Sequence, residues 1–148
     1  MAAKFLVAMI LFAVASCSSS PPTDDPGDSP GAAFETYRSL LEARALSAES
    51  AVLTDDSRDL LSGGYSGGQQ AREASVVSGV IDDAETVVSG DRAVVWFPGS
   101  EHASPYFLRR SPEGWRIDLA SMAQYIGFDG QNRWYFRSTN HPYLFAFQ

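Results

Sequence analysis

The apolar residues of this 148-residue chain change their spacing near Ser75, and this change limits the folds that the chain can adopt. Before Ser75, apolar side chains recur every three to four residues, as on one face of a helix. After it, short runs alternate between apolar and polar side chains, which is typical of strands. Helices followed by antiparallel hairpins predict an α+β domain, in which N-terminal helices pack on a curved antiparallel sheet of about four to six strands.

Two helices are expected in the first half of the domain. The first covers residues 32–46, and its apolar stripe contains Phe34, Tyr37, Leu40 and Leu41. The second is expected to begin after Thr54, a capping residue, and to end before the glycine pair at 63–64. Residues 65–74 are predicted as a loop or a short helix.

Strands are expected from Ser75 onward. The apolar residues of 76–81 suggest a first strand, and residues 86–97 predict a hairpin around the turn Ser89–Asp91. A second hairpin is expected over 106–119, around the turn at 112–114. The aromatic segments 134–136 and 143–147 predict one or two further strands, and Ser121 is expected to cap a turn of helix between these regions.

The N-terminal segment has the pattern of a secretory signal peptide. Lys4 precedes an apolar run over 5–14, and small residues then lead to Cys17, the only cysteine. The tetrad 14–17, Val-Ala-Ser-Cys, resembles the lipobox of bacterial lipoproteins. This resemblance implies cleavage before Cys17, a diacylglyceryl group on its sulfur, further acylation such as palmitate, and a location in the cell envelope. Ser18 resembles the sorting signal for the outer membrane, where the domain would face the periplasm.

Other uses of this segment are less consistent with the sequence. A membrane-spanning helix needs roughly 20 apolar residues, about twice this run. An ordinary signal peptide, cut elsewhere, would leave Cys17 unpaired in an oxidising compartment. The predicted organisation is therefore a signal peptide (1–16), a lipidated cysteine with a disordered Ser/Pro/Asp tether (17–31), and a single α+β domain (32–148). Fully extended, the tether would reach roughly 45 Å at ~3.3 Å per residue.

Charge and composition exclude some functions. The formal net charge is −7 and the chain has no basic run, which argues against binding to nucleic acid. With one cysteine, the domain has no disulfide and its core must be stabilised by burial.

Three segments together resemble the nuclear-transport-factor-two-like fold, also called ketosteroid isomerase-like or cystatin-like. They are the apolar stripe of 34–41, the run 53–58 and the strand 113–118, so the resemblance covers about residues 33–120. It implies a pocket between helices and sheet. Enzymes of this fold use a carboxylate base in that pocket, with tyrosine or a protonated acid that holds an oxyanion.

This resemblance implies a catalytic reading in which Asp118 is the base and Tyr37 and Tyr106 assist it. The alternation of the strand argues against it, because Asp118 points away from the apolar face of Trp115 and Ile117. A cross-strand ion pair of Asp118 with Arg109 or Arg110 is the alternative. No catalytic motif is present, so catalysis is not the favoured reading.

Metal binding is not predicted, and no cofactor is expected. His102 and His141 are the two histidines, and with Glu101 they lack the spacing of a metal site. Both histidines are expected in surface loops.

The aromatic residues are the predicted binding residues. Successive residues of a strand point to opposite faces, so some aromatic surface should stay exposed unless another element covers it. Such a surface would bind a protein partner, a glycan or an apolar ligand, although burial on both faces explains the pattern equally well. The residues selected are Trp96, Tyr106, Trp134, Tyr135 and Phe136.

These observations predict an envelope lipoprotein that acts as a non-catalytic binding or assembly module for an envelope protein or a small apolar ligand. One alternative is an enzyme of the ketosteroid isomerase-like kind. Another is an inhibitor or immunity lipoprotein, which would present a concentrated acidic face to a basic target.

We expect Cys17→Ser to abolish acylation, because serine has no thiol to form the thioether. Metabolic labelling with a radioactive fatty acid and fractionation of the membranes would measure this. A Cys17→Ser protein that is still labelled and anchored like the unmodified sequence would contradict the lipobox assignment.

Overall fold

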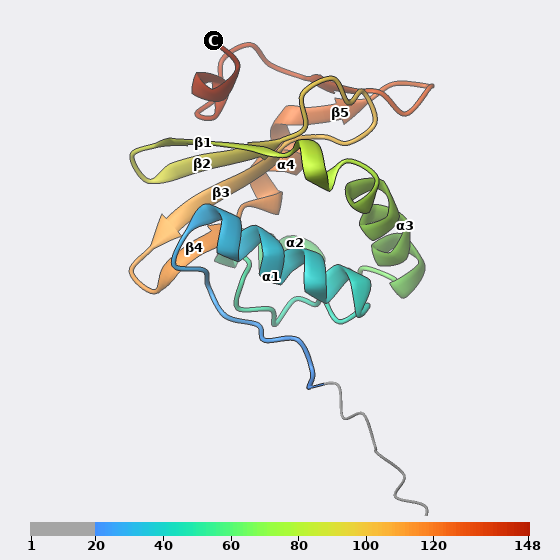
Figure 1. Cartoon of the computed structure of the whole chain (residues 1–148), viewed down its shortest axis with the longest axis vertical. Helices are drawn as coiled ribbons and strands as arrows, with labels where there is room; N and C mark the ends of the chain where they lie inside the picture. The colour runs from blue at the N-terminus through green and yellow to red at the C-terminus, as the bar shows by residue number, and fades with distance from the viewer. Residues whose placement is uncertain (1–19) are drawn as a thin grey trace, which may run out of the picture.

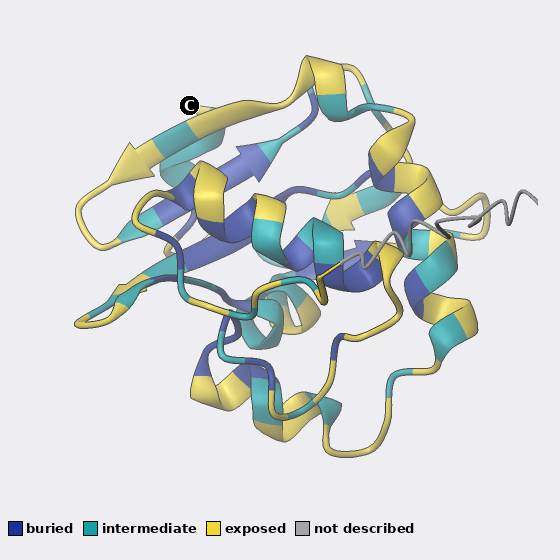
Figure 2. Cartoon of the chain, turned by 60° about the horizontal axis from the view of Figure 1, so that its bottom comes forward, coloured by how far each residue is buried: buried dark blue, intermediate teal, exposed yellow. Residues whose placement is uncertain are grey.

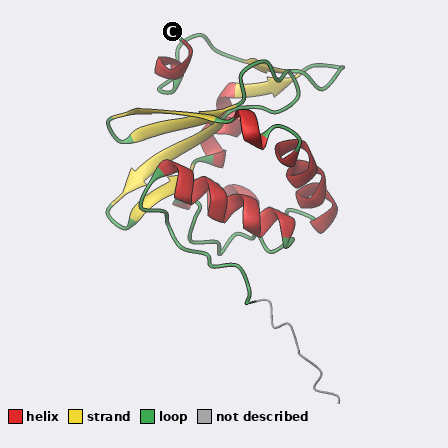
Figure 3. Cartoon of the chain, viewed as in Figure 1, coloured by secondary structure: helices red, strands yellow, loops and turns green. Residues whose placement is uncertain are grey.

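The computed structural model describes residues 20–148, so the segment predicted as a signal peptide and Cys17 lie outside the described residues. The helices are α1 (Pro30–Glu42), α2 (Asp55–Leu61), α3 (Gly67–Ser78) and α4 (Leu119–Tyr125), with 3₁₀ turns η1 (Ile81–Asp83) and η2 (Leu144–Phe147). The strands are β1 (Glu85–Ser89), β2 (Arg92–Trp96), β3 (Tyr106–Ser111), β4 (Gly114–Ile117), β5 (Ile126–Phe128) and β6 (Trp134–Phe136) (Figures 1 and 3). Within residues 20–148, no helix is long and apolar enough to cross a membrane.

The main sheet is an antiparallel meander of four strands in the order β1-β2-β3-β4. Both predicted hairpins are confirmed. Gly90 forms the first turn with φ +60°, a left-handed conformation that glycine adopts without steric cost. Strands β5 and β6 form a separate two-stranded ribbon.

The two central strands of the main sheet, β2 and β3, are buried on both faces, whereas β1 is largely exposed (Figures 1 and 2). On one face, Val95 and Leu108 pack against helices α1 and α3 in the larger core. On the other, Val94 and Phe107 pack under the β5–β6 ribbon and the C-terminal segment, where Tyr143 stacks on Phe107 with ring centroids 4.1 Å apart. The α+β prediction is confirmed: N-terminal helices pack on an antiparallel sheet, and the C-terminal segment adds a further layer.

The strand expected over 76–81 is wrong, because α3 runs to Ser78 and η1 follows it. Ser66 and Gln69 form a capping box that starts α3. Apolar residues at 76, 77, 80 and 81 fit a helical period as well as a strand, and Val77 is buried while Val76 is 44 % exposed. The capping box starts the helix inside the glycine-rich segment 65–74, which the sequence pattern did not resolve. The valines at 76 and 77 then continue this helix instead of starting a strand.

The tether prediction is wrong for residues 24–31, which pack on the domain. The Asp24 carboxylate accepts hydrogen bonds from the backbone N–H groups of Ala51 and Val52. Gly27 is buried and pairs with Trp115 at the edge of β4, with N···O distances of 3.0 and 2.8 Å. Ser29 then caps α1, which begins at Pro30. Hydrogen bonds to the domain hold this segment in place, although it has few apolar residues to bury. Composition alone does not reveal such hydrogen bonds.

Two further expectations about the C-terminal half need correction. Asp118, not Ser121, caps α4, and its carboxylate accepts from the Ser121 N–H at 3.1 Å. The expected strand over 134–136 is β6, but the segment 143–147 forms the 3₁₀ turn η2 instead of a strand.

We expect Gly27→Ala to destabilise the domain by about 1–3 kcal/mol, because a methyl group there would overlap the backbone of Ala33. Urea titration followed by tryptophan fluorescence would measure the free energy of unfolding. The control is Gly31→Ala, in the first turn of α1, where the nearest atom is 4.0 Å away and alanine should be neutral or stabilising. Equal stabilities for the two variants would show that the contact of residue 27 with the domain is absent.

Candidate functional site

An open cleft of about 740 Å³ lies beside α3 and is the strongest candidate for a binding site. Its walls come from α3, the loop before β3, α4 and β5. Most of the lining is apolar, from Val76, Val77, Leu119, Met122 and Phe128. Val76 and Phe128 are 44 % and 52 % exposed, so apolar side chains on two walls of the cleft face water.

A cluster of three tyrosines around Glu73 adjoins the cleft. Glu73 is half-buried and, together with Tyr106, lines the cleft. Its Oε1 accepts hydrogen bonds from the hydroxyls of Tyr37 at 2.7 Å and Tyr106 at 2.6 Å. Its Oε2 accepts from the hydroxyl of Tyr65. The four residues, which we call the Glu73 cluster, join α1, the loop before α3, α3 and β3.

The tyrosines of the Glu73 cluster are hydrogen-bond donors. Burial, and then the nearby Glu73 carboxylate, raise the pKa of Tyr37 and Tyr106 well above the usual value of 10. The same two causes raise the pKa of Tyr65. All three hydroxyls therefore keep their protons at neutral pH, and those protons point to Glu73.

Glu73 was not selected from the sequence, although Tyr37 and Tyr106 were. A signal existed: Glu73 comes three residues after Gln70 and four before Val77, both of which are buried, so it lies on the buried stripe of α3. A charged residue in such a stripe needs partners, which the tyrosines provide. A strand over 76–81 would end the helix before Val77, so the stripe is visible only when the helix extends to Ser78.

Asp118 lies elsewhere. It is 2 % exposed, and the predicted ion pair with Arg109 is confirmed. Its Oδ2 accepts from the Tyr143 hydroxyl at 2.7 Å and from the Ser121 hydroxyl at 2.8 Å, and Arg109 Nε approaches to 3.9 Å. Tyr143 covers the face of the sheet opposite the Glu73 cluster, and Asp118 is not among the residues that line the cleft. Asp118 and the two tyrosines therefore do not form one site.

Most of the predicted binding aromatics pack internally. Trp96, Trp134 and Phe136 are half-buried in the second core, and Tyr106 is 4 % exposed in the first. Burial on both faces of the sheet, the alternative given equal weight above, thus accounts for the positions of these four residues. Tyr135 alone is exposed, and it lies over Gly127, where a Cβ would approach its ring to 2.6 Å.

The two histidines differ in burial and in their contacts. His102 is exposed, and its Nδ1 lies 3.0 Å from the carbonyl oxygen of Asn132. His141 is buried, which corrects the expected surface position, and it stacks on Tyr125 with ring centroids 5.1 Å apart. Burial lowers the pKa of His141. Within residues 20–148, no group of three or more His, Cys, Asp or Glu side chains could hold a metal ion.

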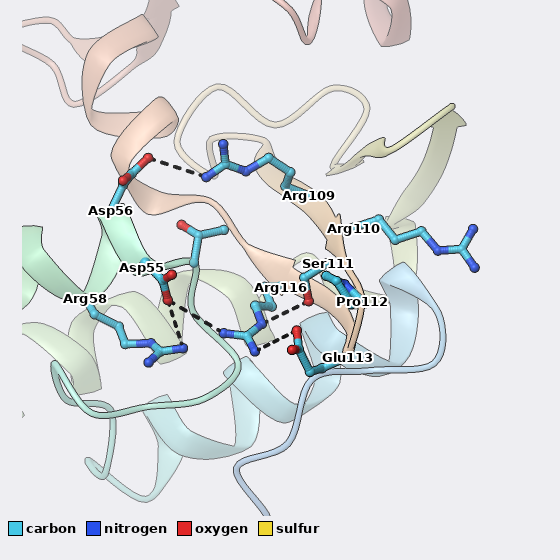
Figure 4. A pocket seen from close by; sticks show the side chains of 10 residues that line it. Asp55, Asp56, Arg58, Arg109, Arg110, Ser111, Pro112, Glu113 and Arg116 are labelled. Carbon is cyan, nitrogen blue, oxygen red and sulfur yellow. Dashed lines mark hydrogen bonds and ion pairs between the residues drawn. The ribbon is translucent and has the colours of Figure 1, made fainter.

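A second cleft, of about 720 Å³, is charged (Figure 4). Its arginines are largely neutralised by neighbouring carboxylates. Arg58 and Arg116 lie 3.3 and 3.9 Å from Asp55, and Arg109 lies 3.4 Å from Asp56. Exposed ion pairs of this kind contribute little to the free energy of folding, and they are typical of a solvated surface. The charged cleft is therefore a weaker candidate than the apolar one.

Comparisons with protein families, with curated proteins and with solved structures find no match for this chain.

We expect Tyr106→Phe to lower the free energy of unfolding by about 1–3 kcal/mol at neutral pH, because the variant removes one donor from Glu73. A tyrosine whose pKa is raised by folding stabilises the protein below about pH 10, and this contribution falls as the pH rises above 10. Stability should therefore fall above about pH 10, and less steeply in the variant.

Urea titrations at about pH 8 and about pH 11 would measure both effects. The control is Tyr135→Phe, which changes an exposed hydroxyl and should have little effect. A Tyr106→Phe protein with unchanged stability and pH dependence would contradict the geometry of the Glu73 cluster.

Proposed function

We propose that this protein is an envelope lipoprotein, anchored through lipid on Cys17 in the outer membrane, whose domain is a non-catalytic binding module for a small apolar ligand. The observation that carries the proposal is the apolar cleft beside α3. The anchor rests on the lipobox resemblance of residues 14–17. The domain would hold its ligand close to the membrane.

The chemistry of the cleft supports a small ligand. Its volume, about 740 Å³, falls within the range of roughly 300–1,000 Å³ that ligand sites occupy. Such sites combine apolar walls with a few polar groups that orient the ligand. Here Leu119 and Met122 contribute to the walls and Glu73 is such a polar group. Filling the cleft would remove the exposed surfaces of Val76 and Phe128 from water, which is favourable.

Binding is favoured over catalysis because the groups that an enzyme would need are committed elsewhere. The hydroxyl protons of Tyr37 and Tyr106 are donated to Glu73, so they are not free to hold an oxyanion. Asp118 is surrounded by its own donors on the other side of the sheet. An inhibitor is also less favoured, because Asp55 and Asp56 are paired with arginines.

We expect Val76→Asp to weaken binding of the fluorescent apolar probe N-phenyl-1-naphthylamine at least tenfold, since a carboxylate on the cleft wall would have to be desolvated. The control is Val88→Asp, which places the same charge on the exposed β1 residue, 52 % exposed and outside the lining of the cleft. Fluorescence titration of the mature chain carrying Cys17→Ser, in buffer without lipid, would measure both affinities.

Both variants replace an exposed valine, so both should fold, and near-ultraviolet circular dichroism would verify this. Equal probe affinity in the two variants would show that the probe binds outside the cleft. No binding by the unmodified cleft would refute the proposed ligand-binding function.

A further inference from the structure

We infer that the cleft selects ligands whose polar head is a hydrogen-bond donor, a hydroxyl or an ammonium, and that the Glu73 carboxylate receives this donor. The inference rests on the proposed binding function and specifies the class of ligand. The observation that supports it is one hydrogen-bond acceptor position of Glu73 that the three tyrosines leave open.

Counting the hydrogen bonds at Glu73 identifies the open position. A carboxylate has about four acceptor positions, two on each oxygen. Oε1 uses two for Tyr37 and Tyr106, and Oε2 uses one for Tyr65. One acceptor position therefore remains, on Oε2. Each tyrosine has one hydroxyl proton, which it already donates to Glu73, so none of the three can fill this position as well.

The position of Glu73 makes this acceptor accessible to a ligand. Glu73 is half-buried and lines the cleft, and the apolar residues Val76 and Val77 follow it on the same helix. A molecule with an apolar body against these valines can therefore direct a polar end to Oε2. A donor at that end would complete the hydrogen bonding of the carboxylate, whereas a carboxylate there would place two like charges together.

Besides the Glu73 cluster, the ionisable residues that line the cleft are His102 and Arg72. His102 uses its Nδ1 on the Asn132 carbonyl, and it is exposed. Arg72 also lines the cleft and is exposed. A ligand with a carboxylate head would therefore pair with Arg72 in contact with water, where ion pairs are weak.

The variant Glu73→Gln changes the head-group preference with little change in shape. The two tyrosine donors at one oxygen hold the amide oxygen of glutamine in that place, so its NH₂ group takes the place of Oε2. Tyr65 can accept from this NH₂, because a hydroxyl is both donor and acceptor. The open position then presents a donor, and the preference should move toward ligands with an acceptor head.

The experiment compares three probes of equal chain length: decylamine, decan-1-ol and decanoate. Each displaces N-phenyl-1-naphthylamine from the mature chain carrying Cys17→Ser, in buffer without lipid. We expect the amine and the alcohol to displace the dye at concentrations at least tenfold lower than those needed for decanoate. The reason is that their heads form a hydrogen bond to a charged group, which is worth about a factor of ten or more in affinity. Glu73→Gln should reduce this ratio at least fivefold, and the exposed control Glu101→Gln should leave it unchanged.

A second variant, Tyr65→Phe, tests whether the effect of Glu73→Gln is only a disturbance of the structure of the Glu73 cluster. It removes the donor at Oε2 and opens another acceptor position, so the preference for the amine and the alcohol should be kept or increased. Loss of the preference in Tyr65→Phe would contradict the inference. So would decanoate that displaces the dye as well as the alcohol does, or an unchanged ratio in Glu73→Gln. Those results would leave the proposed function standing, because the dye still binds, whereas failure of the dye itself to bind would refute both.

Discussion

Burial of the central strands β2 and β3 on both faces is the constraint on which the rest of the structure depends. Phe107 faces the C-terminal segment, and its neighbours Tyr106 and Leu108 face the helices. Tyr143 links the C-terminal segment to the end of β4, since it stacks on Phe107 and donates its hydroxyl proton to Asp118 at 2.7 Å. Asp118 in turn caps α4, whose Leu119 and Met122 form part of the cleft wall. The C-terminal cover therefore supports one wall of the cleft.

The fold could be predicted where local pattern and tertiary environment agree. The hairpins follow from alternation and from turns such as that at Gly90, and α1 follows from its apolar stripe. The α3 helix could not be predicted as readily, because paired valines fit two periods and only packing decides between them. The strap formed by 24–29 could not be predicted either, because its order comes from backbone partners such as Trp115 that lie far away in the sequence.

The candidate site was predicted in part. The catalytic alternative implied by the family resemblance groups Tyr37 with Tyr106, and the structure does bring their rings to 5.5 Å. Their partner is Glu73 instead of Asp118, because β3 directs Tyr106 to the helices while Asp118 turns to the other face to cap α4. Sequence spacing gives the face of a residue within one element, but it does not show which carboxylate a distant helix brings to that face.

The packed strap also changes the mechanical freedom of the domain. Within residues 20–148, Asp24 is the first residue with a hydrogen bond to the domain, and it follows Cys17 by seven residues. A lipid on Cys17 would then restrain the domain within roughly 23 Å of the anchor at ~3.3 Å per residue, about half the reach of a tether that extends to residue 31. Since the accessible volume varies as the cube of the reach, it falls to about one eighth. The effective concentration of the cleft relative to molecules in the same leaflet rises by a corresponding factor.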